Sequence, residues 1–177
     1  MIDRIIIPPK LSFLKSNFFR IGSFALKKIK FQIVKFEKDI LYIWVGGSCD
    51  YGHKERAGGG AYIAQRFLEE SKDGAGAETV QTYTCADFDT KEFQMIYRAM
   101  DHALAQFGEQ NSLTKTSLTE SQAKQKIVFL SNVQYIQNYP KHENVEIKIL
   151  PYHKFPQQKE VHDLASEAMK QQRDAAK

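Results

Sequence analysis

The chain has 177 residues, of which 42% are hydrophobic and 12% aromatic, and a formal net charge of +4. This length and composition fit one globular domain with its own core and exclude an intrinsically disordered chain. The two cysteines, Cys49 and Cys85, form no CxxC pair, which argues against a structural zinc site or a disulfide framework and favours the reducing cytoplasm. No apolar run approaches the length of a membrane span, so we expect a cytoplasmic protein without one.

The positive charge is concentrated near the start of the sequence. Residues 1–38 hold nine lysines and arginines against two acidic residues, which leaves the rest of the chain net acidic. Apolar residues recur at helical spacing between residues 11 and 29, so we predict a basic amphipathic arm over residues 1–35, followed by a domain over residues 36–177. The same pattern suits a helix that binds a membrane surface, a partner groove or a nucleic acid. It equally suits a helix packed on the domain, or residues upstream of the natural start.

After the arm, the first half of the domain is predicted to form three strands. Residues 39–47 form a nearly continuous apolar run, which is typical of a buried central strand. Residues 58–68 and 79–86 resume extended patterns, and glycine-containing turns separate the three segments. Since the links are short, we expect an antiparallel meander.

The second half alternates between helix and strand. Residues 89–107 carry a helical apolar stripe, with Asp89 as the expected N-cap and Glu92 at the third helical position. The following segments are predicted as a strand at 126–131, a short helix at 133–139, a strand at 144–152 and an amphipathic helix at 160–176. The element order is therefore βββαβαβα, an α/β fold.

Four local stretches together resemble the ribonuclease H-like superfamily, over roughly residues 36–172. They are VGGSC at residues 45–49, Glu92 at the first helix, LSNVQYIQNY at residues 130–139, and His153 followed ten residues later by Asp163. VGGSC resembles the strand-one motif of a hydrophobic residue, Asp, Gly and Ser. LSNVQYIQNY resembles the strand-four motif of Thr, Asp, Ser, Gln, Tyr and an aliphatic residue. The resemblance implies a five-stranded mixed sheet, three antiparallel strands then two parallel ones, with helices packed on its faces.

The resemblance also implies two-metal hydrolysis of phosphodiesters, in which four carboxylates hold two Mg²⁺ ions. Carried across by position, the strand-one Asp falls on Gly46 and the helix Glu on Glu92. The strand-four Asp falls on Asn132, the last Asp on Asp163, and the mobile-loop His on His153.

Two of the four implied ligands are therefore missing. Gly46 has no side chain, and Asn132 offers an amide oxygen without charge. Asp50 lies beyond the expected strand end, several ångströms from the place of the missing carboxylate. We expect the two-metal reaction to be lost and no cofactor to be required. Mg²⁺ would bind only if residual activity persists, at Glu92 and Asp163.

Each retained residue also has a structural explanation. Glu92 can complete a capping box with Asp89, and Asp163 in the first turns of a helix suits the positive end of its dipole. His153 in a loop is most often an ordinary surface residue. The pair Gly46 and Gly47 can simply let another backbone approach the strand.

Three functional hypotheses follow. The first is a catalytically degenerate ribonuclease H-like domain that acts by binding RNA or an RNA–DNA hybrid, with Lys27, Lys28 and Lys30 contacting phosphates. The second is a protein–protein interaction or homodimerisation module that uses the apolar stripe of the arm. The third is residual metal-dependent ribonuclease H activity.

Overall fold

The computed structural model describes residues 35–52, 56–72, 74–108 and 125–176. The predicted arm at residues 1–35 and its candidate phosphate contacts Lys27, Lys28 and Lys30 lie outside these residues, except for Lys35. The division into an arm and a domain stays a prediction. Within the described residues, none of the helices combines the length and apolar character needed to cross a membrane.

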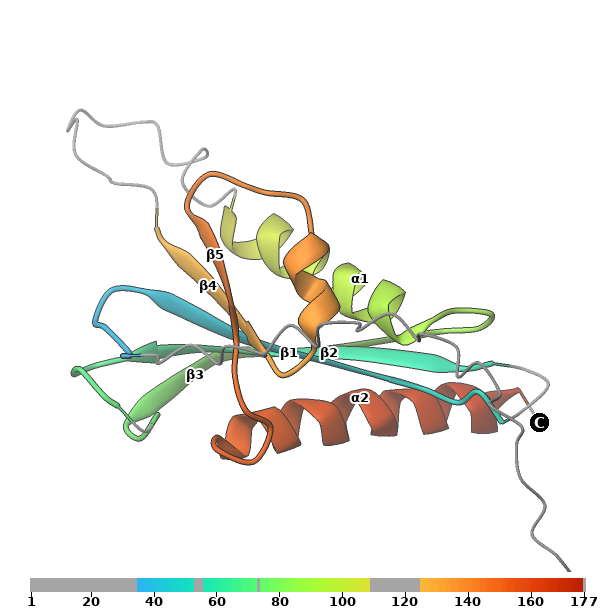
Figure 1. The fold of residues 1–177 in the computed structure, drawn as a ribbon. Coiled ribbons are helices and arrows are strands. Elements are labelled where there is room, and N and C mark those ends of the chain that lie inside the picture. The colour runs from blue at the N-terminus through green and yellow to red at the C-terminus, as the bar shows by residue number, and fades with distance from the viewer. Residues whose placement is uncertain (1–34, 53–55, 73, 109–124, 177) are drawn as a thin grey trace, which may run out of the picture.

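The described residues form a single mixed sheet with helices on both faces (Figure 1). The elements are β1 (Leu41–Cys49), β2 (Gly58–Phe67), β3 (Ala77–Asp87), α1 (Glu92–Gly108), β4 (Ile127–Ser131), η1 (Gln134–Asn138), β5 (Val145–Ile149) and α2 (Pro156–Ala175). The strands lie in the order β3-β2-β1-β4-β5. β1 pairs antiparallel with β2 and parallel with β4, β2 pairs antiparallel with β3, and β4 pairs parallel with β5. The predicted sheet of three antiparallel and two parallel strands is confirmed.

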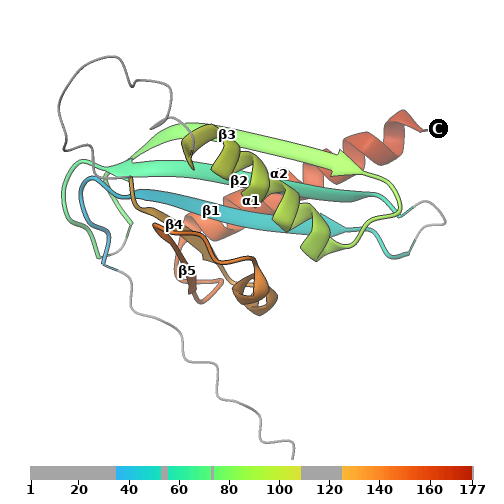
Figure 2. The same ribbon diagram turned by 90° about the horizontal axis from the view of Figure 1, so that it is seen from above.

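The two faces of the sheet bury separate cores. α1 and η1 cover one face, where Ile43 and Val45 of β1 pack against Ile96 and Met100 of α1. α2 covers the other face, where the neighbouring β1 residue Trp44 is buried. Figure 2 shows α1 crossing above β1, β2 and β3, with α2 running beneath the sheet. Alternation of side chains along β1 therefore serves two cores, which explains its continuous apolar sequence.

Two local predictions differ from the structure. Asp89 is not the N-cap of α1, because its φ of 51° lies in the left-handed region and the helix begins only at Glu92. Gln94 makes the capping contact instead. Its side-chain amide oxygen accepts a hydrogen bond from the backbone N–H of Lys91 at 2.8 Å. The short helix predicted at residues 133–139 is present as the 3₁₀ helix η1. α2 begins at Pro156, earlier than predicted, because proline suits the first helical turn.

Candidate functional site

Gly46 lies in β1 on the face that α2 covers, and the helix fills the space of a side chain there. A β-carbon on Gly46 would lie 3.0 Å from Cγ1 of Val161 and 3.3 Å from the backbone nitrogen of His162. Val161 is fully buried. The position that would carry the strand-one carboxylate is therefore used to bring α2 against the sheet.

Two glycines of β2 also allow a helix to approach the sheet closely. Gly59 on β2 also faces α2, and a β-carbon there would lie 2.0 Å from the carbonyl oxygen of Ala165. Gly60 faces α1, and its β-carbon would lie 2.3 Å from the carbonyl oxygen of Met95. Since Gly46 and Gly59 lie on paired strands, they form one seat for α2, which we call the glycine seat. Backbone atoms cannot be displaced as easily as side-chain ends, so this close approach requires glycine.

Glu92 opens α1 on the opposite face of the sheet. Its side chain is half-buried, and its Cγ lies 3.1 Å from the point where a β-carbon of Gly47 would stand. Its backbone N–H donates a hydrogen bond to the hydroxyl of Tyr51 at 3.4 Å. The side chain of Gln94, not that of Glu92, makes the capping contact at the start of α1. The capping-box explanation for Glu92 is therefore wrong.

Aromatic side chains lie around Glu92, in a cluster that was not predicted from the sequence. Tyr51 is 61% exposed and Phe93 is 38% exposed. The ring of Phe93 contacts Tyr97 and Tyr135 edge-on, at centroid distances of 5.9 and 6.0 Å. The signal for them was present, since Tyr51 follows the first strand, Phe93 adjoins Glu92 and Tyr135 lies within the strand-four motif.

Tyr135 is the innermost member of this cluster. The Tyr97 hydroxyl donates a hydrogen bond to the Tyr135 carbonyl oxygen at 3.0 Å, which fixes η1 to α1. The Tyr135 hydroxyl is buried. Burial, followed by the negative charge of Glu92, raises the pKa of Tyr135. The cluster therefore presents exposed rings over a neutral phenol.

Asn132 follows directly after the short strand β4 and is exposed. Its neighbour Ser131 is fully buried and accepts the backbone N–H of Val133 at 3.3 Å. This local turn ends the strand and leads into η1. Asn132 thus stands at the carboxyl end of β4, as predicted from the motif order.

Asp50 is engaged elsewhere and does not replace the missing carboxylate. Its Oδ2 accepts a hydrogen bond from Arg173 near the end of α2 at 3.0 Å, and its Oδ1 accepts the backbone N–H of Gly52 at 3.0 Å. The Arg173 side chain is 27% exposed and the Asp50 side chain 15%. The pair fixes the last turns of α2 to the end of β1.

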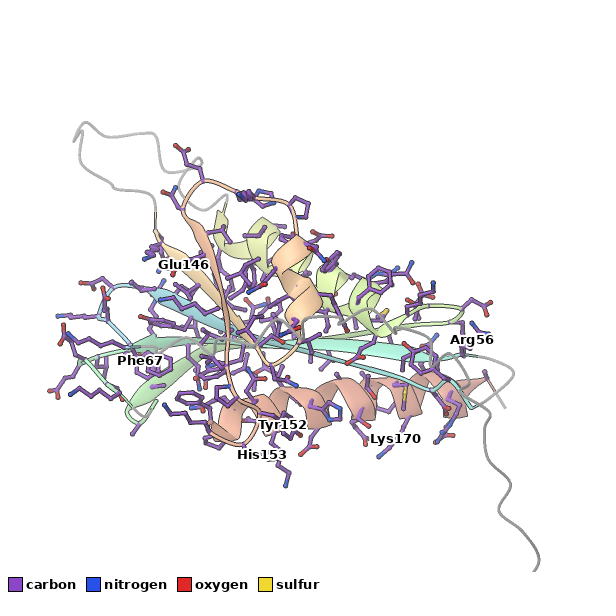
Figure 3. The ribbon with its side chains drawn as sticks, in the orientation of Figure 1. Arg56, Phe67, Glu146, Tyr152, His153 and Lys170 are labelled. Atoms are coloured by element: carbon purple, nitrogen blue, oxygen red, sulfur yellow. The ribbon has the colours of Figure 1, made fainter. Side chains whose placement is uncertain are left out.

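Asp163 and His153 lie on the α2 side of the molecule. Asp163 is exposed and lines a shallow hollow on the outer surface of α2. His153 is exposed in the loop that precedes α2, and its ring lies 5.1 Å from that of Tyr152 (Figure 3). Tyr152 also lies 6.3 Å from His162 of α2. Of the residues implied by the resemblance, Glu92 therefore lies on the α1 side of the sheet, whereas Asp163 and His153 lie on the α2 side.

The residues present do not fit a two-metal centre. Among the described residues, no group of three or more His, Cys, Asp and Glu side chains could hold a metal ion. Val161 fills the place beside Gly46, and the Asp50 carboxylate is paired with Arg173. Mg²⁺ prefers several hard oxygen ligands in octahedral geometry, and these residues do not provide them.

No protein-family model and no curated protein matches the sequence. Solved structures do match the fold. The crystal structure of LC9-RNase H1, a type 1 RNase H with the type 2 active-site motif, is 16% identical with a TM-score of 0.52, covering 77% of this chain and 75% of that chain. The foamy viral protease-reverse transcriptase in complex with dsDNA is 8% identical with a TM-score of 0.52, covering 73% and 93%. The same viral protein in complex with an RNA/DNA hybrid is 9% identical with a TM-score of 0.54, covering 92% of this chain and 22% of that chain. These likenesses confirm the predicted ribonuclease H-like fold.

Proposed function

We propose that this chain, which has the ribonuclease H-like fold, is a non-catalytic domain that acts by binding RNA or an RNA–DNA hybrid. The observation that carries the proposal is the glycine seat. At Gly46, where the fold family places a metal-bridging carboxylate, Val161 of α2 takes up the room. A side chain regained there would require Val161 or the neighbouring backbone of α2 to give way.

The proposal of nucleic-acid binding has two further supports. Exposed aromatic rings are platforms on which unpaired bases stack, and Tyr51 and Phe93 provide such rings beside the carboxyl end of β1. Among the structures that share the fold, the foamy viral protein is seen in complex with an RNA/DNA hybrid. The basic residues of the arm would add phosphate contacts without sequence preference.

Cleavage is the first test. The full chain is incubated with a labelled RNA–DNA hybrid in Mg²⁺ and in Mn²⁺, beside a Glu92→Gln, Asp163→Asn double variant. We expect no cleavage by either protein. Cleavage by the parent chain that the double variant abolishes would establish residual ribonuclease activity and sink the proposal.

Binding is the second test, measured by fluorescence anisotropy with labelled single-stranded RNA and RNA–DNA hybrid at several salt concentrations. We expect affinity to fall steeply with salt, as phosphate binding does. Phe93→Ala should weaken binding about tenfold if a base stacks on that ring. Leu68→Ala is the matched control, because Leu68 is 66% exposed and follows β2 at the end away from its glycines. Equal loss in both variants, or no binding to either nucleic acid, would contradict the proposal.

A further inference from the structure

Glu92 brings a carboxylate without an ionic partner into the aromatic cluster. Its side chain is half-buried, and none of the lysines, arginines or histidines that the structure describes forms an ion pair with it. By contrast, Asp87 at the end of β3 is paired with Arg98 of α1 at 2.9 Å. An ionised carboxylate only accepts hydrogen bonds, and it accepts stronger ones than a neutral oxygen does. Glu92 therefore suits a ligand that presents N–H donors.

The contacts of Glu92 place it beside the exposed rings. The Tyr51 hydroxyl accepts its backbone N–H at 3.4 Å, and Phe93 is its neighbour in α1. Burial, followed by the negative charge of Glu92, raises the pKa of Tyr135, which agrees with a carboxylate close to that buried hydroxyl. The ring of Tyr135 in turn meets that of Phe93 at 6.0 Å. One cluster therefore offers both flat apolar surfaces and a charged acceptor.

This combination of groups distinguishes between paired and unpaired bases, and between the four bases. The bases of a duplex are stacked on one another, so only an unpaired base can lie on a protein ring. On its Watson–Crick edge, guanine presents the N1–H and the 2-amino group side by side, which matches the two oxygens of a carboxylate. Adenine and cytosine present one amino group beside an acceptor nitrogen, and uracil presents one N–H between two carbonyl oxygens. A carboxylate repels these acceptors, so guanine is the base that fits.

We propose that the cluster binds an unpaired guanine of RNA, stacked against the exposed rings of Tyr51 and Phe93, with its Watson–Crick edge on the carboxylate of Glu92. This choice of base rests on the proposed binding of RNA and adds a specificity to it. Glu92 then reads a base and needs no metal ion for this role.

Fluorescence anisotropy with a short labelled oligouridine tests the choice of base. One central nucleotide is guanosine, inosine or adenosine, and inosine differs from guanosine only by the missing 2-amino group. We expect the full chain to bind the guanosine oligomer about tenfold more tightly than the other two. Equal affinities for the three would overturn the choice of guanine. If Phe93→Ala still weakened that binding, the proposed RNA-binding function would stand, whereas no binding to any oligomer would reject both.

Two variants test the role of Glu92 with the same oligomers. Glu92→Gln should abolish the preference for guanosine, because an amide offers one acceptor and turns an N–H₂ group toward the donors of the base. Asp89→Asn is the matched control, since it removes one negative charge at an exposed position three residues away, where the φ of 51° also suits asparagine. It should keep the preference. A preference that survives in Glu92→Gln, or that is lost equally in both variants, would overturn the assignment of Glu92.

Discussion

Val161 Cγ1 lies 3.0 Å from the point where a β-carbon of residue 46 would stand, which is closer than ordinary van der Waals contact. The contact joins the central strand to a helix that follows it far later in the sequence. It makes the absence of a side chain at Gly46 a condition of helix packing, independent of any chemistry lost with it.

Alanine substitutions at three glycines should rank by the space around them. Gly59→Ala should cost the most stability, because its β-carbon would lie 2.0 Å from a backbone oxygen, and Gly46→Ala should cost about 1–3 kcal/mol. Gly108→Ala, at the end of α1, meets nothing within 4 Å and should be neutral or stabilising. Urea denaturation measures the order. A double-mutant cycle with Val161→Ala should reduce the cost of Gly46→Ala, and strict additivity would show that Val161 is not the obstacle.

Restoring the four carboxylates should not restore a metal site. In Gly46→Asp, Asn132→Asp the new carboxylate at residue 46 must compete with Val161 and the backbone of His162 for space. We expect no Mg²⁺ binding by calorimetry and a less stable fold. Tight binding of Mg²⁺ with cleavage of an RNA–DNA hybrid would show that α2 moves aside easily.

The pair of Asp50 and Arg173 should contribute measurably to the docking of α2. Its N–O distance is 3.0 Å and both side chains are partly buried, so Arg173→Met should loosen the end of α2. Asp174→Asn is the control, since the contact of Asp174 with Arg173 is longer, at 3.5 Å, and Asp174 is more exposed. Hydrogen exchange should show faster opening of the last turn of α2 in Arg173→Met only. Unchanged exchange would mean that the pair does not hold the helix.

Tyr62 should make the fold sensitive to alkaline pH. Burial raises the pKa of Tyr62 from its usual 10 to about 12, and its hydroxyl lies 3.2 Å from Nδ1 of His102. The unfolded chain loses this proton near pH 10 while the folded chain keeps it, so the contribution of Tyr62 is complete below pH 10 and is lost as the pH rises toward 12. Relative to Tyr62→Phe, the parent should lose at most about 1.4 kcal/mol per pH unit in that window. Parallel stability curves for the two proteins would contradict this.

The sequence predicted the sheet well because its signals are local. The apolar run over residues 39–47 and the change to helical spacing at residue 89 depend only on neighbours in the chain. The N-cap of α1 was missed because Asp89 has a left-handed backbone, which is set by the turn from β3.

The site was predicted less completely, because its decisive distances join remote segments. The missing carboxylate could be recognised from the motif at Gly46, but the filling of its place by Val161 depends on how closely α2 approaches. The aromatic cluster likewise depends on η1 meeting α1, where Tyr97 contacts Tyr135. No pattern of neighbouring residues predicts how closely α2 approaches β1 or how η1 contacts α1.

The position of α2 also has a consequence for folding order. Ser48 and Met169, which meet at 3.7 Å, are 121 residues apart, and the underside of the sheet presents Trp44, Phe67 and Leu130 to the helix. Until α2 has been synthesised and docked, these apolar side chains lack the helix that covers this face. Contacts between such distant segments form slowly, and the uncovered sheet is a surface prone to aggregation. We expect a nascent chain halted before residue 156 to require a chaperone, although its five strands are already complete.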